Sequence, residues 1–408
     1  MIAHLFTVIW NRKRANALVL GEIAASFLVL CVVCTTVAYF VHNRRQPLGF
    51  DWHDVWRVRI GFGEYHTSSE EVRSATWERL MRLQQETRAL PGVETAGLMI
   101  NTPYSGDTSS WTMKTPRGEL DVLIGAMAPE AADALRFRIV AGRMFGPGDE
   151  STDWIPLVVN RKLAQALFGD ADPLGQPLPH WDDAGRLRER EADESDFRVI
   201  GVVADYRRDG EVSASPYAAF SQLRAGPNSW PPECILIRTH PGTTAEIEER
   251  LAHRLHELAP DWSFDVRTLA SRRQEALRSR LMPLWIGGTA AAFLIVMVAM
   301  GLMGVLWLNV TRRTRELGLR RALGATAGGV RLQVLGELLA LTTVAVVLGA
   351  IVFMQAPLLG IAGWVPWQIY GAGVLASLLI LYLLVVLCGL YPSWLATRVH
   401  PAQALHYE

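Results

Sequence analysis

Two small groups of residues have the types and spacing of metal or redox sites. His253 and His256 stand three positions apart with Glu257 beside them, which on a helix puts both imidazoles near one face. No third convergent ligand is visible, so a solvated helix face is the preferred interpretation. Cys31 and Cys34 have C-x-x-C spacing but stand inside an apolar run with no second pair. Small thiols fit helix interfaces, which predicts membrane packing for both.

The sequence contains no motif of an enzyme active site or a nucleotide site. Neither G-x-S-x-G nor H-E-x-x-H occurs, and there is no G-x-x-x-x-G-K-[ST] phosphate-binding loop. Gly324–Arg331 is rich in small residues but offers no Lys-Ser or Lys-Thr pair to a phosphate. The prediction is a non-catalytic chain with no catalytic residue, no metal and no cofactor of its own. No nucleic-acid partner is expected.

Four apolar runs are long enough to cross a bilayer, which takes about 20 helical residues. They are residues 17–41, 283–308, 332–354 and 370–391. A mean hydropathy of +0.16 agrees, because such an apolar excess cannot all be buried in a soluble core. The first run follows Arg12, Lys13 and Arg14, but it is too long for a signal peptide and is predicted to be an uncleaved span.

The distribution of Lys and Arg predicts the orientation of the spans. Between the second and third spans, residues 309–331 carry many arginines against a single acid, Glu316, whereas residues 355–369 between the third and fourth spans carry no charge. The arginines are Arg312, Arg313, Arg315, Arg320, Arg321 and Arg331. The terminal segments 1–16 and 392–408 and the loop 309–331 are therefore predicted to be cytoplasmic. Residues 42–282 and 355–369 are then external.

The region 42–282 is predicted to be a mixed α/β domain inserted between the first and second transmembrane helices. Helical spacing appears at 69–90, 129–137, 161–168 and 244–258, and the polar stretch 179–194 is expected to be a flexible excursion. Strands are expected at 55–60, 93–101, 122–127, 155–159, 197–203, 235–239 and 264–267. Leu269–Arg280 favours helix, so one helix is expected to continue from this domain into the second span.

Several residues near the spans have expected roles in the membrane. Trp52, Trp56, Trp364 and Trp367 are predicted to be interfacial anchors. Glu337 lies early in the third span, and a carboxylate at membrane depth is costly unless it is paired or neutral. Snorkelling or pairing with a loop arginine is therefore preferred to a proton path.

The cytoplasmic loop carries the most specific string in the chain. Residues 311–325 read Thr-Arg-Arg-Thr-Arg-Glu-Leu-Gly-Leu-Arg-Arg-Ala-Leu-Gly-Ala. This string resembles the signature of the FtsX/MacB permease family, whose Thr-Arg-Glu-(Ile/Leu)-Gly-(Ile/Leu)-Arg-Arg-Ala-(Leu/Met)-Gly-Ala core leads into the next span. The external stretches Ala141–Phe145, Pro156–Gly175 and Phe197–Gly210 resemble the MacB-type domain. The tail Tyr391–Leu405 is similar to the family's ending, with His406 where the family has Arg.

The resemblance implies the permease subunit of an ABC transporter in the bacterial inner membrane. It implies that ATP and Mg²⁺ are bound by a separate ATPase, whose movement reaches the external domain through the first two spans. A short helix with apolar residues between arginines can dock in a groove of that partner. The predicted coupling residues are Arg315, Glu316, Leu317, Gly318, Leu319, Arg320, Arg321, Ala322, Leu323, Gly324 and Ala325.

Further partners follow from the same resemblance. They are a second permease subunit, identical or related, the membrane lipid, and optionally a periplasmic adaptor or outer-membrane factor. Two alternatives stay open: an FtsX-like signalling subunit that controls an external partner such as a cell-wall hydrolase, and a membrane-anchored enzyme. The large external domain favours export or extraction of a substrate, which the sequence does not identify.

Overall fold

The computed structural model divides into two compact units that alternate along the chain. It describes residues 13–62, 69–106, 109–116, 118–181, 187–188, 196–225, 229, 231–242, 245–312, 326–361 and 363–396. Met1–His42 and Arg280–Glu408 form the first, here called the helical unit, and Asn43–Ser279 form the second, the α/β unit. From the sequence, residues 42–282 were expected to form a domain inserted after the first span.

Four long helices in the described part of the chain make up the helical unit. They are α2 (Lys13–Arg44), α7 (Leu269–Arg312), α9 (Ala327–Leu358) and α10 (Trp367–Ala396). Each contains one of the predicted apolar runs, and by length and composition each can cross a membrane, over Val19–Arg44, Leu269–Gly304, Leu335–Leu358 and Trp367–Leu390. The predicted architecture of four membrane helices is confirmed.

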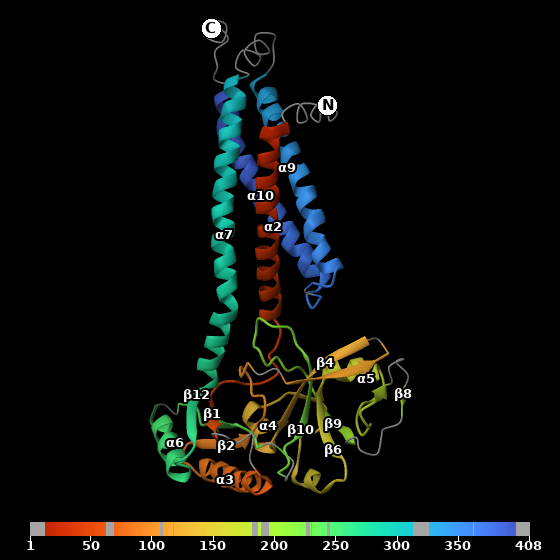
Figure 1. The fold of residues 1–408 in the computed structure, drawn as a ribbon, viewed down its shortest axis with the longest axis vertical. Helices are drawn as coiled ribbons and strands as arrows, with labels where there is room; N and C mark the ends of the chain where they lie inside the picture. Colours follow the sequence, from red (N-terminus) through yellow and green to blue (C-terminus); the bar gives the residue numbers. More distant parts are fainter. Residues whose placement is uncertain are drawn as a thin grey trace. The chain divides into compact units, whose positions relative to one another are not determined.

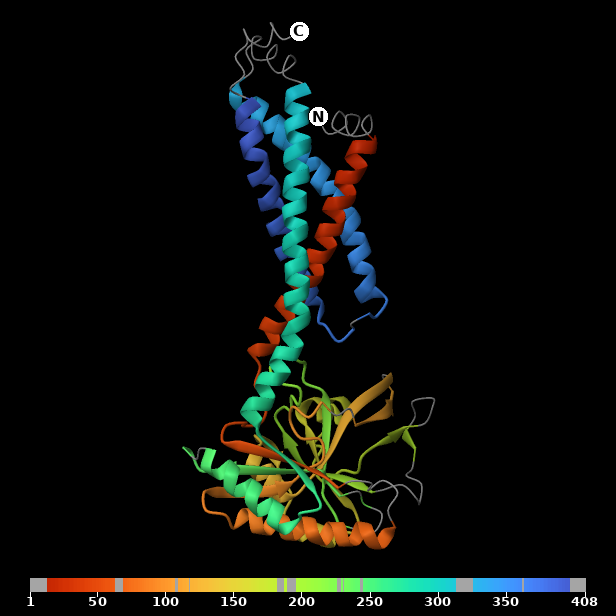
Figure 2. The same cartoon turned by 60° about the vertical axis from the view of Figure 1, so that its left-hand side comes forward.

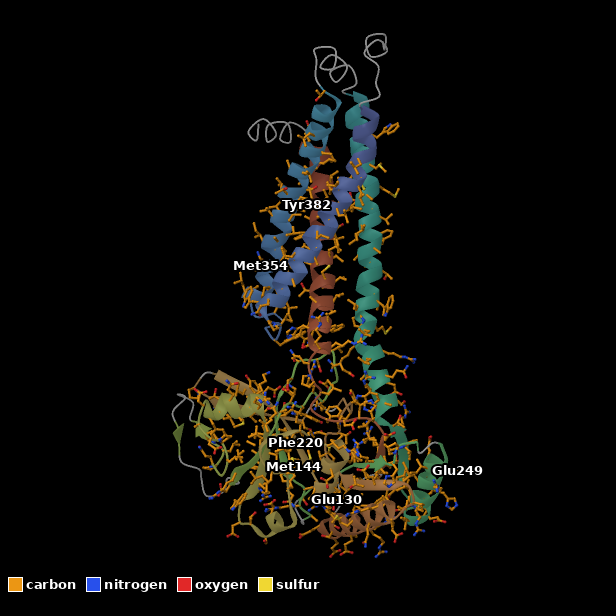
Figure 3. The ribbon with its side chains drawn as sticks, turned by 180° about the vertical axis from the view of Figure 1, so that it is seen from behind. Glu130, Met144, Phe220, Glu249, Met354 and Tyr382 are labelled. Carbon is orange, nitrogen blue, oxygen red and sulfur yellow. The ribbon has the colours of Figure 1, made fainter. Side chains whose placement is uncertain are left out.

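The helical unit is held together by apolar contacts and by close approaches at glycines. Phe27 and Cys31 of α2 are fully buried against α9 and α10. A Cβ on Gly349 of α9 would lie 2.8 Å from the Phe27 ring, and one on Gly373 of α10 would lie 2.1 Å from Thr35 Oγ1. Tyr382 of α10, labelled in Figure 3, hydrogen-bonds Thr343 of α9 at 2.8 Å. Small residues at such crossings let membrane helices pack closely.

A four-stranded sheet forms one half of the α/β unit, in the order β12-β1-β11-β2. Its strands are β1 (Val55–Gly61), β2 (Val93–Leu98), β11 (Cys234–Thr239) and β12 (Ser263–Thr268). Two helices, α3 (Glu70–Arg88) and α6 (Ala245–Leu258), cover one face of this sheet (Figures 1 and 2). Their leucines pack on Val58 and Ile60, as the alternating pattern of β1 predicts.

The second sheet has six strands, in the order β3-β4-β10-β6-β9-β5. All of them come between β2 and β11 in the sequence. The strands are β3 (Ser110–Thr115), β4 (Gly118–Met127), β5 (Ile139–Gly142), β6 (Ile155–Asn160), β9 (Phe197–Val203) and β10 (Tyr217–Gln222). The β4–β10 and β6–β9 pairs are parallel, and the other pairs are antiparallel. The helices that accompany it are α4 (Pro129–Leu135), α5 (Arg161–Phe168) and a 3₁₀ turn, η2 (Pro147–Ser151).

One apolar core joins the two sheets. Val55 and Leu236 of the first sheet, Phe220 of the second and Leu269 of α7 all belong to it. Phe220, labelled in Figure 3, is 1% exposed and meets the Tyr206 ring edge-on at 4.8 Å between centroids. The first turn of α7 is therefore part of the folded α/β unit, and the mixed α/β domain predicted between the first and second membrane helices is confirmed.

Three strands of the six-stranded sheet were missing from the prediction. β10, with the sequence Tyr-Ala-Ala-Phe-Ser-Gln, has little β-branched character but is central, since it pairs with both β4 and β6. β3 and β5 are the edge strands, and their side chains are mostly exposed, so neither shows a clear alternation of apolar residues.

Two further expectations need correction. The stretch 179–194 is not wholly an irregular excursion, because β7 (His180–Trp181) and β8 (Leu187–Arg188) pair within it; its other residues from 182 on lie outside the described part. Trp56 is not an interfacial anchor. It points to the same face of β1 as Val58 and Ile60 and is only 8% exposed in the core beneath α3 and α6.

Trp52 also has a role inside the α/β unit. Its ring packs against the shared core, stacks on His53 and carries the Arg273 guanidinium 4.5 Å from its centroid. Trp364 and Trp367 are 64% and 55% exposed, and their predicted role as interfacial anchors stays a prediction.

Candidate functional site

The predicted coupling segment, Arg315–Ala325, lies outside the described residues. The structure describes the helices on either side of it. α7 ends at Arg312, and α9 begins after Thr326, whose Oγ1 accepts the N–H of Gly329 at 3.2 Å. This side chain satisfies one of the free N–H groups of the first turn. In Figure 1 the end of α7 and the starts of α2 and α9 lie at the same end of the helical unit.

A second candidate site holds both ends of the α/β unit, namely the residues at the end of α2 and those at the start of α7. Its centre is Arg207, which follows β9 and is fully buried. Arg207 Nη1 donates to the carbonyls of Asn43 at 2.6 Å and Gln46 at 3.1 Å. Its other donors reach the carbonyls of Glu211 and Ser213, each at 2.9 Å. We call these five residues the Arg207 hub.

The hub gives α2 a C-terminal cap supplied by a distant segment. α2 ends at Arg44, so the Asn43 carbonyl belongs to its last turn, where carbonyls lack a partner within the helix. A guanidinium suits this position because it presents five donors in a fixed plane and its positive charge favours the negative end of the helix dipole. The backbone N–H of Arg207 also donates to Leu48 at 3.0 Å, which fixes the chain beyond the helix.

The same hub reaches the start of α7. The Glu211 carboxylate forms a close ion pair with Arg273 of α7. One residue earlier, Arg272 donates to the Tyr104 carbonyl at 3.3 Å and pairs with Glu275 at 3.0 Å. The Thr268 hydroxyl accepts the Ser271 N–H at 3.1 Å and caps the helix. The residues that follow α2 and those that begin α7 are thus tied to one loop, Tyr206–Ser213.

A second buried arginine fixes the chain between α2 and β1. Arg238 of β11 is 2% exposed and donates to the carbonyls of Ala134 at 2.7 Å and of Asp51 and His53 at 3.0 Å each. It also lies 3.2 Å from the Asp51 carboxylate. Burial lowers the pKa of this guanidinium, and the Asp51 charge opposes that shift. Two buried arginines therefore hold successive parts of the segment 43–54.

The motif at Ala141–Phe145 forms an ion pair that we expect to stabilise the α/β unit at neutral pH. Arg143 makes two bonds to Asp149, of 2.5 and 2.6 Å, and the Gly146 N–H donates to the same carboxylate. The hydrogen bonds from Arg143 lower the pKa of Asp149, whose side chain is only 4% exposed, and the Arg224 charge adds to this.

A depressed carboxyl pKa stabilises the fold above the unfolded-state pKa, and this contribution is lost as the pH falls through the folded-state value. We therefore expect Asp149→Asn to lower the thermal unfolding midpoint of the full chain in detergent at pH 7, with a difference from wild type that shrinks below about pH 4. The exposed neighbour Asp153, replaced in Asp153→Asn, is the control and should show no such pH dependence. A difference that stayed constant with pH would contradict the role of the ion pair.

The residues that could do chemistry do not converge. His253 is 74% exposed in its side chain and contacts Glu257 at 3.3 Å, as a solvated helix face does. No group of three potential metal ligands occurs among the described residues. Cys31 is buried in the core of the helical unit, Cys34 is half-buried, and both are free thiols. Glu337 is half-buried near the start of α9.

Sequence reasoning missed both buried arginines. Arg207 lies in the stretch Tyr206-Arg-Arg-Asp-Gly210, which entered the sequence analysis only as part of the family resemblance, and Gly210 adopts a left-handed φ of +91° there. The local signal was a pair of arginines that begins four positions after the end of β9. Arg238 stands in a strand whose residues are all buried, and a charge in such a run indicates a fixed partner.

The chain is similar to known transporter components over most of its length. Residues 17–254 match the MacB-like periplasmic core domain, and residues 288–401 match the FtsX-like permease C-terminal domain. The macrolide export ATP-binding/permease protein MacB of Bdellovibrio bacteriovorus is 27% identical over 66% of this chain and 41% of that protein. An uncharacterized ABC transporter permease of Bacillus subtilis, YknZ, is 24% identical over 80% of this chain and 79% of that one.

A pyoverdine export ATP-binding/permease protein, PvdT of Pseudomonas savastanoi pv. phaseolicola, is 30% identical over 66% of this chain and 40% of that protein. This chain thus spans less than half the length of the MacB and PvdT relatives. Among solved structures, the periplasmic region of MacB from Actinobacillus actinomycetemcomitans aligns with 55% of this chain and 92% of that one, at 13% identity and a TM-score of 0.36.

The first match covers most of α2 and the α/β unit as far as residue 254, and α9 and α10 lie within the second match. Since the MacB-like match alone covers more than half of the 408 residues, this multi-pass membrane protein belongs to the MacB/FtsX family of ABC transporter permeases.

Proposed function

We propose that this permease couples ATP hydrolysis by a separate ATPase subunit to movement of its α/β unit on the outer side of the inner membrane, and so drives export or extraction of a substrate. ATP and Mg²⁺ would be bound by the ATPase, and two permease subunits would act together. The observation that carries the proposal is α7, one helix from Leu269 in the α/β core to Arg312, three residues before Arg315.

The Arg207 hub supports the same proposal from the other end. Because the loop Tyr206–Ser213 bonds both the end of α2 and the start of α7, a displacement of either helix would act on the folded α/β unit. The names of the MacB and PvdT relatives include export and ATP binding. These names favour export for this chain and an ATP-binding domain as its partner.

We expect charge reversal in the coupling segment to uncouple the ATPase. Arg320→Glu with Arg321→Glu, and separately Gly318→Trp, should weaken association with the co-expressed ATPase in nanodiscs at least about tenfold, the equivalent of about 1.4 kcal/mol. Reversed charges would repel the partner's surface, and an indole at Gly318 would not fit a close contact. The measurements are co-purification and ATPase activity with and without the permease.

The matched control is Arg161→Glu, a charge reversal at an exposed position on α5 of the α/β unit. It should leave association and ATPase activity at wild-type levels. If the loop variants also bound and stimulated the ATPase normally, the coupling assignment would be wrong. Binding of a cytoplasmic ATPase to this loop also tests the predicted orientation, because the loop can be reached only from its own side of the membrane.

A further inference from the structure

Several buried polar atoms beside the Arg207 hub have no hydrogen-bond partner among the described residues. They are Tyr104 Oη and Glu211 Oε2, together with Asn43 Nδ2. Tyr104 and Asn43 are only 4% and 2% exposed. A buried polar atom left without any partner costs about 1–3 kcal/mol, and such atoms are rare in native proteins. Unpaired atoms gathered around one hub therefore need a physical explanation.

The loop that carries Tyr104 is held in an unfavourable backbone conformation. Asn101 and Tyr104 have φ values of 61° and 58°, and every residue from Asn101 to Tyr104 is buried. The left-handed region is costly for a side chain as large as that of Tyr. Two hydrogen bonds hold Tyr104 in this conformation. The Tyr104 N–H donates to the Arg208 carbonyl at 2.9 Å, and the Arg272 guanidinium donates to the Tyr104 carbonyl at 3.3 Å.

The Tyr104 hydroxyl and the Glu211 carboxylate share one neighbourhood. The Tyr104 ring lies against Gly210, where an added Cβ would come within 2.9 Å of it. Burial raises the pKa of the Tyr104 phenol, and the nearby Glu211 charge raises it further, while Arg273 and Arg207 oppose the shift. The phenol is therefore neutral at pH 7 and can donate a hydrogen bond, and Glu211 Oε2 can accept one.

The charges around these atoms select the class of ligand. Charges of both signs act on these atoms: Arg207 and Arg273 disfavour a cation, and the Glu211 carboxylate disfavours an anion. A small neutral group with both a donor and an acceptor fits, which is the chemistry of water. Buried waters in proteins typically make about three hydrogen bonds to polar groups that would otherwise be unpaired.

We propose that an ordered water molecule is bound between Tyr104 Oη and Glu211 Oε2 and bridges the loop before β3 to the hub. The water extends the bonding of Glu211, which already pairs with Arg273 through its other oxygen. The water is a structural ligand of the hub, where the end of α2 and the start of α7 are bonded to one loop.

The test is Tyr104→Phe in the full chain, purified in detergent without any ATPase. Phenylalanine keeps the ring and removes only the oxygen. If the hydroxyl holds a bridging water, the thermal midpoint should fall by about 2–4 °C, because the water loses one partner. If the hydroxyl is an unpaired buried group, its removal should leave the midpoint unchanged or raise it, and the proposal fails.

The control is Tyr217→Phe on β10, where the half-buried ring lies under Lys162 and the described residues offer its hydroxyl no hydrogen bond; its midpoint should not change. If the Tyr104→Phe midpoint falls, a high-resolution map of the wild-type chain decides whether a bound water is the cause. Density for one water within hydrogen-bonding distance of both oxygens supports the proposal. A fall in midpoint without that density overturns it. Neither result depends on ATPase coupling, so failure here and failure of the proposed function are distinguishable.

Discussion

Replacing Arg207 with methionine should remove most of the stability of the α/β unit. Methionine fills a similar volume but has no donor, so the carbonyls of Asn43, Gln46, Glu211 and Ser213 lose the hydrogen bonds of the guanidinium, while the Asn43 carbonyl keeps the N–H of Gln46. A buried carbonyl left without a donor costs about 1–3 kcal/mol, so the loss of this set of bonds is a large part of the stability of a typical domain, about 5–15 kcal/mol. Limited proteolysis of the full chain in detergent should then cut within residues 43–279 at temperatures where the wild type resists.

Two further variants distinguish the effect of losing the hub's hydrogen bonds from the effect of losing a positive charge. Arg198→Met removes an arginine that is 45% exposed, pairs with Asp196 two positions away and lies 5.8 Å from the Trp154 ring centroid, so the expected change is within about 0.5 kcal/mol. Arg207→Lys keeps the charge but presents it as a single ammonium, which cannot match a planar set of carbonyls. Its stability should lie between those of the wild type and Arg207→Met. Wild-type protease resistance in Arg207→Met would contradict the role of the hub.

The membrane helices could be predicted from sequence because lipid imposes a simple requirement. A helix that crosses a bilayer must be apolar over its full width, whatever surrounds it. The four helices each contain one predicted run, and they extend past it at one end or both because polar residues such as Lys13 and Arg312 continue the helix beyond the apolar part. Strands such as β1, β9 and β11 were predicted from their β-branched and apolar residues, which suit a buried sheet.

The hub could not be predicted because its bonds join parts of the chain that are far apart. Asn43 and Arg207 are separated by 164 positions, and what they share is a backbone carbonyl, which carries no sequence signal. β10 was missed for a related reason: its place between β4 and β6 is set by partners, and its own residues show little preference for a strand. The coupling segment was identified only by its resemblance to a family signature, and its residues lie outside the described part of the chain.

We expect Gly373→Ala to disrupt the packing of α2 against α10. An added Cβ would lie 2.1 Å from Thr35 Oγ1, and also 2.7 Å and 2.8 Å from the Cα and backbone N of Thr35. A hydroxyl could rotate away, but the backbone of Thr35 can move only if the two helices separate. Overpacking of this kind typically costs about 1–3 kcal/mol, and separated helices would also lose contacts at Phe27 and Cys31. The measurement is the thermal midpoint of the detergent-purified chain.

Gly371→Ala is the matched control, two residues earlier on the same helix. No atom lies within 4 Å of its added Cβ, so the substitution changes helix propensity without changing the packing. Alanine favours a helix over glycine by about 1 kcal/mol in exposed positions, so this variant should be as stable as the wild type or more so. The same chemical change is thus expected to have opposite effects at Gly371 and Gly373. Equal midpoints for the two variants would mean that α2 and α10 do not pack closely at Thr35.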